Sequence, residues 1–357
     1  MSVYYFDISG DKIYQIAAAT SINKGNGYTV PSVDPNNLDQ VLDKPMILWP
    51  PLYSVILAPI ATITENPAIA SFILDIAVNV FFLLLIIQIC DILGFPFWLK
   101  ILTLLFKATE INEVVVASTP TDYLALDLWL AAILAAVIYL KRGGTIAAIF
   151  FIILNALAPW LRYASIPVVI VLPAVVIISG LWRKDRGVVR VGLVAGIIAI
   201  ASTGVLLFYN DVRSGAFFFV LETTSGFYPE NLLYTPAIFW TSIFNTSFVL
   251  TQASIHSGIY YGTLNDTLKL TSFLALIILA IYVIKRTNWK TFRQAPNHFF
   301  FLATSLSLAT IGSLAWLGIT RSRNYLVDRY WTYIEDHRYM LIITTTIFFF
   351  LLHEFIL

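Results

Sequence analysis

The sequence predicts an all-α protein, a polytopic bundle of membrane-spanning helices. Hydrophobic residues make up 59% of the 357 residues and charged residues only 12%, with a mean hydropathy of +0.80. A soluble globular chain carries about 25% charged residues. Apolar runs that approach the roughly 20 residues needed to cross a bilayer recur along the chain. We expect about nine spans, at 67–92, 98–118, 120–140, 144–160, 163–182, 190–209, 268–284, 298–319 and 339–357.

Charge and cysteine content exclude several other classes of protein. The formal net charge is +1, which excludes a strongly basic nucleic-acid-binding protein, so no nucleic-acid partner is expected. The single cysteine, Cys90, cannot form an internal disulfide and gives no metal-binding motif. The segment before Asp11 has neither the basic start nor the apolar core of a cleavable signal peptide.

Basic connections between the apolar runs predict the orientation of the chain. Lysine and arginine gather in three of these connections: 141–142, 183–186 and 285–293. The positive-inside rule assigns such loops to the cytoplasm. Alternation of the spans then places four candidate residues on the outer face: Asp11, Asp122, Arg162 and Arg338. We therefore divide the chain into an outer loop, 1–66, and a transmembrane domain, 67–357, which carries a second outer loop at 210–267.

The first outer loop contains signals for two short helices. Apolar residues at positions i, i+3 and i+4 from Ile13 predict a helix, and 24–27 (Lys-Gly-Asn-Gly) ends it, because Gly and Asn tolerate positive φ. Pro50-Pro51 predicts the start of a second helix at 52–63. That helix is too short to span a bilayer, so we expect it to lie in the membrane interface.

Short motifs in this loop resemble a known family of membrane enzymes. Asp11 and a Tyr14-bearing helix are followed by Gly25-Asn26-Gly27-Tyr28-Thr29 and then by Trp49-Pro50-Pro51-Leu52-Tyr53. In order and spacing they resemble the first outer loop of the GT-C membrane glycosyltransferases. Within that family, the motifs resemble those of the bacterial branch, which is similar to the dolichyl-phosphate-mannose protein mannosyltransferases and the aminoarabinose transferase.

The resemblance implies a function in the cell envelope. A sugar would pass from a polyprenyl-phosphate donor to a lipid, glycan or protein acceptor, with inversion at the anomeric carbon. The site would face outward from a bacterial inner (plasma) membrane, and membrane lipid would be a further partner. Family members have a transmembrane helix directly before the catalytic Asp, whereas only about ten residues precede Asp11. The first family helix is therefore missing from this sequence: either the start of the chain is placed too late, or the chain is a fragment, or the protein does without that helix.

Asp11 and Asp122 are the candidate catalytic residues. An ionised carboxylate at the boundary between water and membrane can deprotonate an acceptor hydroxyl. The resemblance implies this role for Asp11, and for Asp122, within Thr121-Asp122, a role in assisting the first acid or binding a metal. Both positions also suit helix capping, and Asp7 is the alternative to Asp11. Asp127 lies deeper in the span and should face the bundle interior, because an acid exposed to lipid is costly.

Three cations are candidate ligands of the donor phosphate. Arg162 and Arg338 lie in segments that resemble family motifs at the outer ends of spans, and an arginine can bind phosphate through two parallel hydrogen bonds. Snorkelling to the interface is the alternative role for Arg162. The family has a lysine before Pro-Pro where this chain has Trp49, and Lys44 is the candidate substitute.

The resemblance also implies a substrate pocket, and it leaves a divalent metal ion open. Five aromatic residues are candidates for the pocket: Tyr14, Tyr28, Trp49, Tyr53 and Tyr339. Asp43 and His337 are weak candidate metal ligands, since one histidine among loosely spaced acids is not a recognised metal motif. No other cofactor is expected.

Two other interpretations compete with the enzyme hypothesis. The chain could be a transporter or flippase of lipid-linked sugars, or an inactive member of the family in which the motifs have changed. Transporters tend to show internal repeats and helices broken by Gly or Pro at the bilayer midplane. Here the polar residues gather at one predicted surface, which favours the enzyme.

Overall fold

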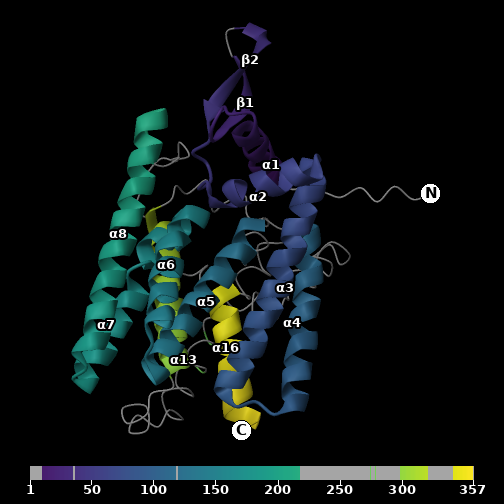
Figure 1. The fold of residues 1–357 in the computed structure, drawn as a ribbon. Coiled ribbons are helices and arrows are strands. Elements are labelled where there is room, and N and C mark those ends of the chain that lie inside the picture. The colour runs from purple at the N-terminus through teal and green to yellow at the C-terminus, as the bar shows by residue number, and fades with distance from the viewer. Residues whose placement is uncertain are drawn as a thin grey trace. The chain divides into compact units, whose positions relative to one another are not determined.

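The computed structural model describes residues 10–34, 37–117, 120–217, 274, 278, 298–320 and 341–356 (Figure 1). They fall in two compact units, Met1–Phe219 and Val220–Leu357. The first unit contains α1 (Gly10–Asn23), β1 (Thr29–Asp34), β2 (Asn37–Pro45), α2 (Leu52–Thr64), α3 (Pro67–Leu93), α4 (Phe97–Ala117), α5 (Pro120–Arg142), α6 (Thr145–Leu161), the 3₁₀ helix η1 (Tyr163–Val168), α7 (Val171–Arg183) and α8 (Arg186–Ser214). In the second unit, α13 (His298–Thr320) packs against α16 (Leu341–Ile356).

The expected helical membrane bundle is confirmed in its coarse form. Within the described residues, 4 helices are long and apolar enough to cross a membrane: Pro67–Leu93, Thr121–Arg142, Tyr163–Arg183 and Arg186–Ser214. The apolar segments of α6, α13 and α16 are shorter. The predicted span at 268–284 lies largely outside the described residues. The number of spans therefore stays a prediction.

Local sequence signals explain where the long helices begin and end. The Asn66 side chain caps α3 by accepting hydrogen bonds from the backbone N–H of Ala68, at 3.0 Å, and of Ile69, at 3.2 Å. Asp185 caps α8 in the same way, with 2.8 Å to the Gly187 nitrogen. At the other end of α3, Gly94 adopts the left-handed conformation with φ 75°. These caps satisfy backbone groups that the helices themselves leave unpaired.

The two short helices predicted in the first outer loop are present. Helix α1 ends at Asn23, and Gly25 and Gly27 then take φ values of 80° and 78°, as the Gly-rich turn predicts. Helix α2 follows directly after Pro51. Both helices pack on α3, so the outer loop belongs to the same compact unit as the first spans.

A β-hairpin lies between α1 and α2, which corrects the all-α prediction. Strands β1 and β2 are antiparallel, with Val33 opposite Val41. The β-branched residues Thr29, Val30 and Val33 of β1 favour an extended backbone. Pro31 is accommodated in β1 because both strands of a two-stranded sheet are edge strands, where Pro is tolerated. The hairpin extends beyond α1 at the end of the unit that also holds α2 (Figure 1).

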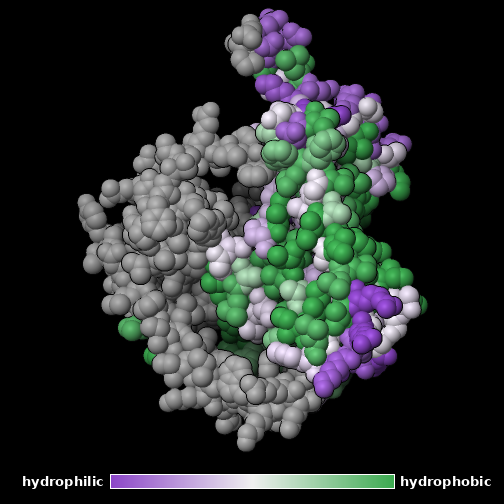
Figure 2. Space-filling model, turned by 90° about the vertical axis from the view of Figure 1, so that its left-hand side faces the viewer, coloured by the Kyte–Doolittle hydropathy of each residue, from purple (hydrophilic) through white to green (hydrophobic). Residues whose placement is uncertain are grey.

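The exposed side of α8 has the apolar character of a surface that faces lipid. Large apolar side chains on it are strongly exposed, including Ile197 at 66% and Phe208 at 66%. Figure 2 shows a hydrophobic band over the described helices, with hydrophilic residues beyond it at both ends. A soluble protein rarely exposes so continuous an apolar surface, whereas a bilayer covers it.

Helices α7 and α8 pack closely through glycine. A Cβ atom placed on Gly192 would lie only 2.7 Å from Ile177 Cγ1 and 3.0 Å from the Pro173 carbonyl oxygen. A Cβ on Gly204, further along the same helix, would have no atom within 4 Å. Small residues allow backbones to approach in this manner in membrane bundles.

Replacing Gly192 should therefore separate α7 from α8. We expect Gly192→Ala to destabilise the protein by about 1–3 kcal/mol, the usual cost of overpacking. The matched change Gly204→Ala should be neutral or stabilise by up to about 1 kcal/mol, since Ala favours helix over Gly. Thermal unfolding in detergent compares the two variants. Equal melting temperatures would contradict the close packing at Gly192.

Candidate functional site

The structure brings together two sequence-predicted site residues, Asp122 and Arg162. Asp122 lies in the first turn of α5, and Arg162 follows the last residue of α6, which runs antiparallel to α5. Their side chains form an ion pair and are 3% and 13% exposed, respectively. The prediction that both residues lie at the same end of the bundle is therefore consistent with the packing of α5 on α6.

The ion pair changes what each partner can do chemically. Arg162 is neutralised by Asp122, so it brings no net positive charge to a donor phosphate. Asp122 uses Oδ1 in the pair, whereas Oδ2 is buried and has no hydrogen-bond partner among the described residues. A buried acceptor without a partner is costly, and a substrate hydroxyl would satisfy it.

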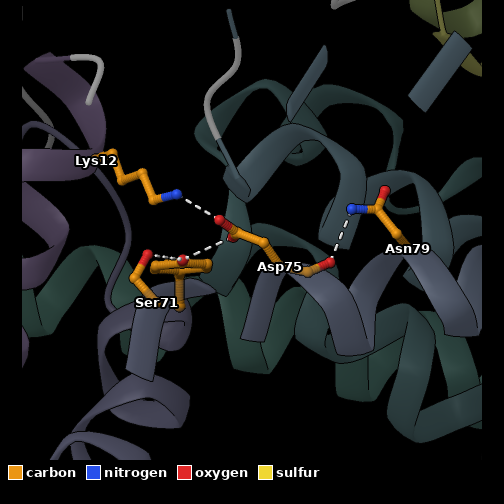
Figure 3. Close-up of polar contacts among 5 residues, drawn as sticks. Lys12, Ser71, Asp75 and Asn79 are labelled. Carbon is orange, nitrogen blue, oxygen red and sulfur yellow. Dashed lines mark hydrogen bonds and ion pairs between the residues drawn. The ribbon is translucent and has the colours of Figure 1, made fainter. Parts of the chain in front are cut away.

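A second buried polar cluster, which sequence analysis missed, joins α1, α2 and α3 (Figure 3). Lys12 forms an ion pair with Oδ2 of Asp75, and the two side chains are 19% and 17% exposed. The Tyr53 hydroxyl donates to Asp75 Oδ1 at 3.3 Å and lies 3.3 Å from the Ser71 hydroxyl. The carboxylate of Asp75 is thereby held by partners from α1 and α2.

The sequence did contain a signal for this cluster. Ser71, Asp75 and Asn79 recur at i, i+4 and i+8, which places them on one face of an otherwise apolar helix. An acid in an apolar span is costly unless it is paired and usually marks a functional position. Its partner Lys12 lies 63 residues away in the sequence, so the pairing itself required the fold.

Asp11, the first catalytic candidate, lies in the first turn of α1, directly before Lys12. The helix that carries it packs on α2 and α3. The remaining candidates Asp7, Arg338, His337 and Tyr339 lie outside the described residues.

The predicted pocket aromatics fall into two groups. Tyr14 and Trp49 stack with ring centroids 5.5 Å apart, and Tyr14 is 46% exposed, so they form an accessible aromatic surface. Tyr28 and Tyr53 are buried. The Tyr28 hydroxyl donates to the carbonyls of Trp49 and Pro50, at 2.9 and 3.1 Å. Tyr28 thus fixes the turn that leads into α2.

Both buried tyrosines remain protonated hydrogen-bond donors at neutral pH. Burial raises the pKa of Tyr28, and the nearby Tyr163 adds to that effect. Burial also raises the pKa of Tyr53, with a further contribution from the charge of Asp75. Neither residue is therefore suited to act as a base.

Lys44 and Asp43 lie on β2 of the hairpin and are exposed. Asp43 accepts a hydrogen bond of 2.8 Å from the Asn26 side chain, which ties the hairpin to the Gly-rich turn. Among the described residues, no group of three or more His, Cys, Asp or Glu side chains could hold a metal ion. Asp43 is therefore not part of such a group in that part of the chain.

Asp127 faces the bundle interior, as expected. Its side chain is fully buried, and neither carboxyl oxygen has a hydrogen-bond partner within the described part of the chain. Tyr123, one helical turn before it, packs edge-on against Phe82 of α3 at 6.3 Å. By helical spacing, Asp127 therefore lies on the side of α5 that faces α3.

Arg213 is a second residue that sequence analysis missed. It lies exposed in the last turn of α8, with its guanidinium 6.0 Å from the Tyr209 ring centroid. A Cβ on Gly27 would be 3.1 Å from Arg213 Nη2, so the guanidinium rests against the Gly-rich turn. Within the described residues it has no carboxylate partner.

Comparison with models of known protein families, with characterised proteins and with solved structures found no match. The described residues offer two acid–cation pairs, an exposed aromatic pair and an exposed arginine for chemistry at this end of the chain.

The Asp122–Arg162 pair makes a prediction about stability. Arg162→Met leaves a buried carboxylate without its counter-charge, which should cost about 3–5 kcal/mol. The double variant Arg162→Met/Asp122→Asn removes both charges and should recover most of that loss. Unfolding of the single and double variants in detergent measures the coupling. Additive effects of the two changes would show that the pair does not contribute.

Proposed function

We propose that this protein is a membrane glycosyltransferase of the GT-C type, which moves a sugar from a polyprenyl-phosphate donor to an acceptor hydroxyl. The observation that carries the proposal is the gathering of ionisable and aromatic side chains at one end of an apolar bundle. The Asp122–Arg162 pair is there, together with the helix that bears Asp11 and the stacked Tyr14 and Trp49. In this proposal that end faces outward from a bacterial inner membrane.

The environment of this end suits a donor that is both lipid and sugar. The exposed apolar faces of the helices would accommodate a polyprenyl chain in the bilayer. The charged and aromatic residues of the protein would lie where the polyprenyl chain of the donor joins its phosphate. Aromatic rings such as those of Tyr14 and Trp49 are well suited to packing on the apolar face of a sugar, since they combine apolar area with polar edges.

In the proposed reaction, Asp11 acts as the general base. Its carboxylate accepts the proton of the acceptor hydroxyl, and the hydroxyl oxygen forms a bond to the anomeric carbon of the sugar. The bond from that carbon to the phosphate oxygen breaks, and its electron pair leaves with the polyprenyl phosphate. Asp122 Oδ2 accepts a hydrogen bond from a substrate hydroxyl and orients it. Inversion at the anomeric carbon follows from this single displacement.

The leaving phosphate requires positive charge, which neither ion pair supplies. Lys12 and Arg162 are each held by an aspartate. Arg213 is exposed at the outer end of α8 and has no acidic partner within the described residues. We therefore assign Arg213 to the donor phosphate; the sequence-based assignment of Arg338 to the same role stays a prediction. A guanidinium there would stabilise the charge that develops as the bond breaks.

Transfer should depend on both candidate acids. We expect Asp11→Asn to lower kcat/KM by about 10²–10⁴-fold, the usual contribution of a general base. Asp122→Asn should cost at least about tenfold, because a positioned substrate hydroxyl is lost. Sugar transfer from a labelled polyprenyl-phosphate donor, in membranes with matched protein levels, measures both effects.

The control for this experiment is Asp91→Asn, at the opposite end of α3, where the carboxylate pairs with Lys100. Its activity should match that of the unmodified protein. If Asp11→Asn retained full transfer, the base assignment would be wrong. If the unmodified protein moved labelled donor between leaflets without transferring sugar, the transporter interpretation would replace the enzyme.

Arg213 should affect donor binding more than the maximal rate. We expect Arg213→Gln to raise KM for the donor about tenfold or more, since a charge-assisted contact contributes about 1.5–3 kcal/mol. Arg190→Gln, at the inner end of the same helix, is the matched control and should leave KM unchanged. An equal KM in both variants would exclude Arg213 from the donor site.

A further inference from the structure

Helix α1 is tied to its neighbours by polar contacts at three levels. Near its start, Lys12 pairs with Asp75 of α3. One turn later, the Ser54 hydroxyl of α2 donates to the Gln15 backbone carbonyl at 2.9 Å and also contacts the Gln15 side chain. At its end, the Asn23 side chain donates to the Ala58 carbonyl at 2.8 Å. These contacts fix both the height and the rotation of the helix.

The contact at Lys12 differs from the other two in strength and in place. It joins two opposite charges that are largely removed from water, so losing one partner leaves the other without compensation. It also lies next to Asp11. The first turn of a helix is its least constrained part, because the first N–H groups have no partners within the helix. A tie at Lys12 therefore restrains the turn that would otherwise fray.

The neighbours of Asp75 hold its carboxylate in the direction of Lys12. Tyr53 donates to Oδ1, which leaves Oδ2 for the ammonium group of Lys12. Tyr53 is fully buried and also contacts Ser71. Figure 3 shows Asp75 between Lys12 on one side and Asn79 on the other. The Asn79 side chain donates to the Asp75 backbone carbonyl at 2.8 Å, so the carboxylate itself is held from α2, by Tyr53, before it holds α1.

We propose that Asp75 is a positioning residue for the transfer reaction: through Lys12 it holds the first turn of α1, and with it Asp11, at the outer end of α3. This inference rests on the proposed function, in which Asp11 is the base. The Asp75 carboxylate does not touch the substrate in this proposal, but its loss would lower the rate of transfer by displacing Asp11. A displacement of a catalytic group by about 1 Å can cost about 10²-fold in rate.

The test compares Asp75→Asn with Asn23→Ala in the full-length protein in membranes. Both changes remove one tie of α1, but Asn23 lies roughly 16 Å from Lys12 along the helix, at about 1.5 Å per residue. We expect Asp75→Asn to lower kcat about 10- to 100-fold with little change in donor KM. Asn23→Ala should change neither. Equal losses in the two variants would show a general structural role and would overturn the proposal.

Rescue by charge exchange provides a second test. Lys12→Asp combined with Asp75→Lys restores the attraction with the charges reversed, so it should recover part of the kcat lost in Asp75→Asn. Lys12→Met alone should lower kcat as Asp75→Asn does. A charge-exchange variant no better than the single variants, at normal protein levels, would argue against the ionic tie.

A readout independent of activity separates this inference from the proposed function. In a Cys90→Ala background, the Asp11→Cys variant carries the single thiol, and its labelling by a water-soluble maleimide reports on the first turn of α1. Adding Asp75→Asn should raise the labelling rate severalfold, whereas adding Asn23→Ala should not. Unchanged labelling would overturn the positioning role, even if the protein transfers sugar. Faster labelling in this background, combined with no sugar transfer by the unmodified protein, would support the tie and refute the glycosyltransferase.

Discussion

A carboxylate buried in a bundle of apolar helices needs a compensating charge, and this requirement organises the end of the bundle that carries α1 and α2. Asp75 and Asp122 lie in helices with long apolar segments, where an unpaired charge would be costly. Each is matched by a cation from a different element, Lys12 from α1 and Arg162 from the end of α6. The two pairs therefore tie the first outer loop to α3 and α5 to α6. The positions of α1 on α3 and of α6 on α5, and with them the candidate site residues, depend on these two pairs.

Hydrophobic burial contributes little to directional packing in lipid, so the other contacts of the bundle are steric and polar. Gly192 lets α7 and α8 approach closely. Trp160 reaches from α6 to the Ser202 hydroxyl of α8 at 2.8 Å, and Ser202 in turn donates to the Ala156 carbonyl. These interior contacts leave the outward faces apolar, as Figure 2 shows for the face that it presents. In the described part of the chain, the pairs Lys12–Asp75 and Asp122–Arg162 lie at one end of the bundle, whereas Asp127 lies deeper in its interior.

How much the sequence predicts depends on the range of the interactions involved. Gly25 and Pro51 act within a few residues, and they correctly predict the end of α1 and the start of α2. The hairpin was not predicted, because β1 and β2 show little alternation of apolar and polar residues and their pairing appears only in the fold. The alternation of charged connections predicted that Asp122 and Arg162 share one face. It could not predict their ion pair, nor that of Lys12 and Asp75, because both depend on how separate helices pack.

The same pairing that stabilises the outer end also limits how it can bind an anion. Since Lys12 and Arg162 are each neutralised by an aspartate, a phosphate brought to this end gains little from either. Arg213 can supply the attraction because its guanidinium lies at the exposed end of α8, against Gly27, where a larger residue would displace it. The contact at Gly27 thus links the Gly-rich turn to α8. In the proposed reaction, the acids would position α1 and the substrate hydroxyl, and Arg213 would hold the leaving phosphate.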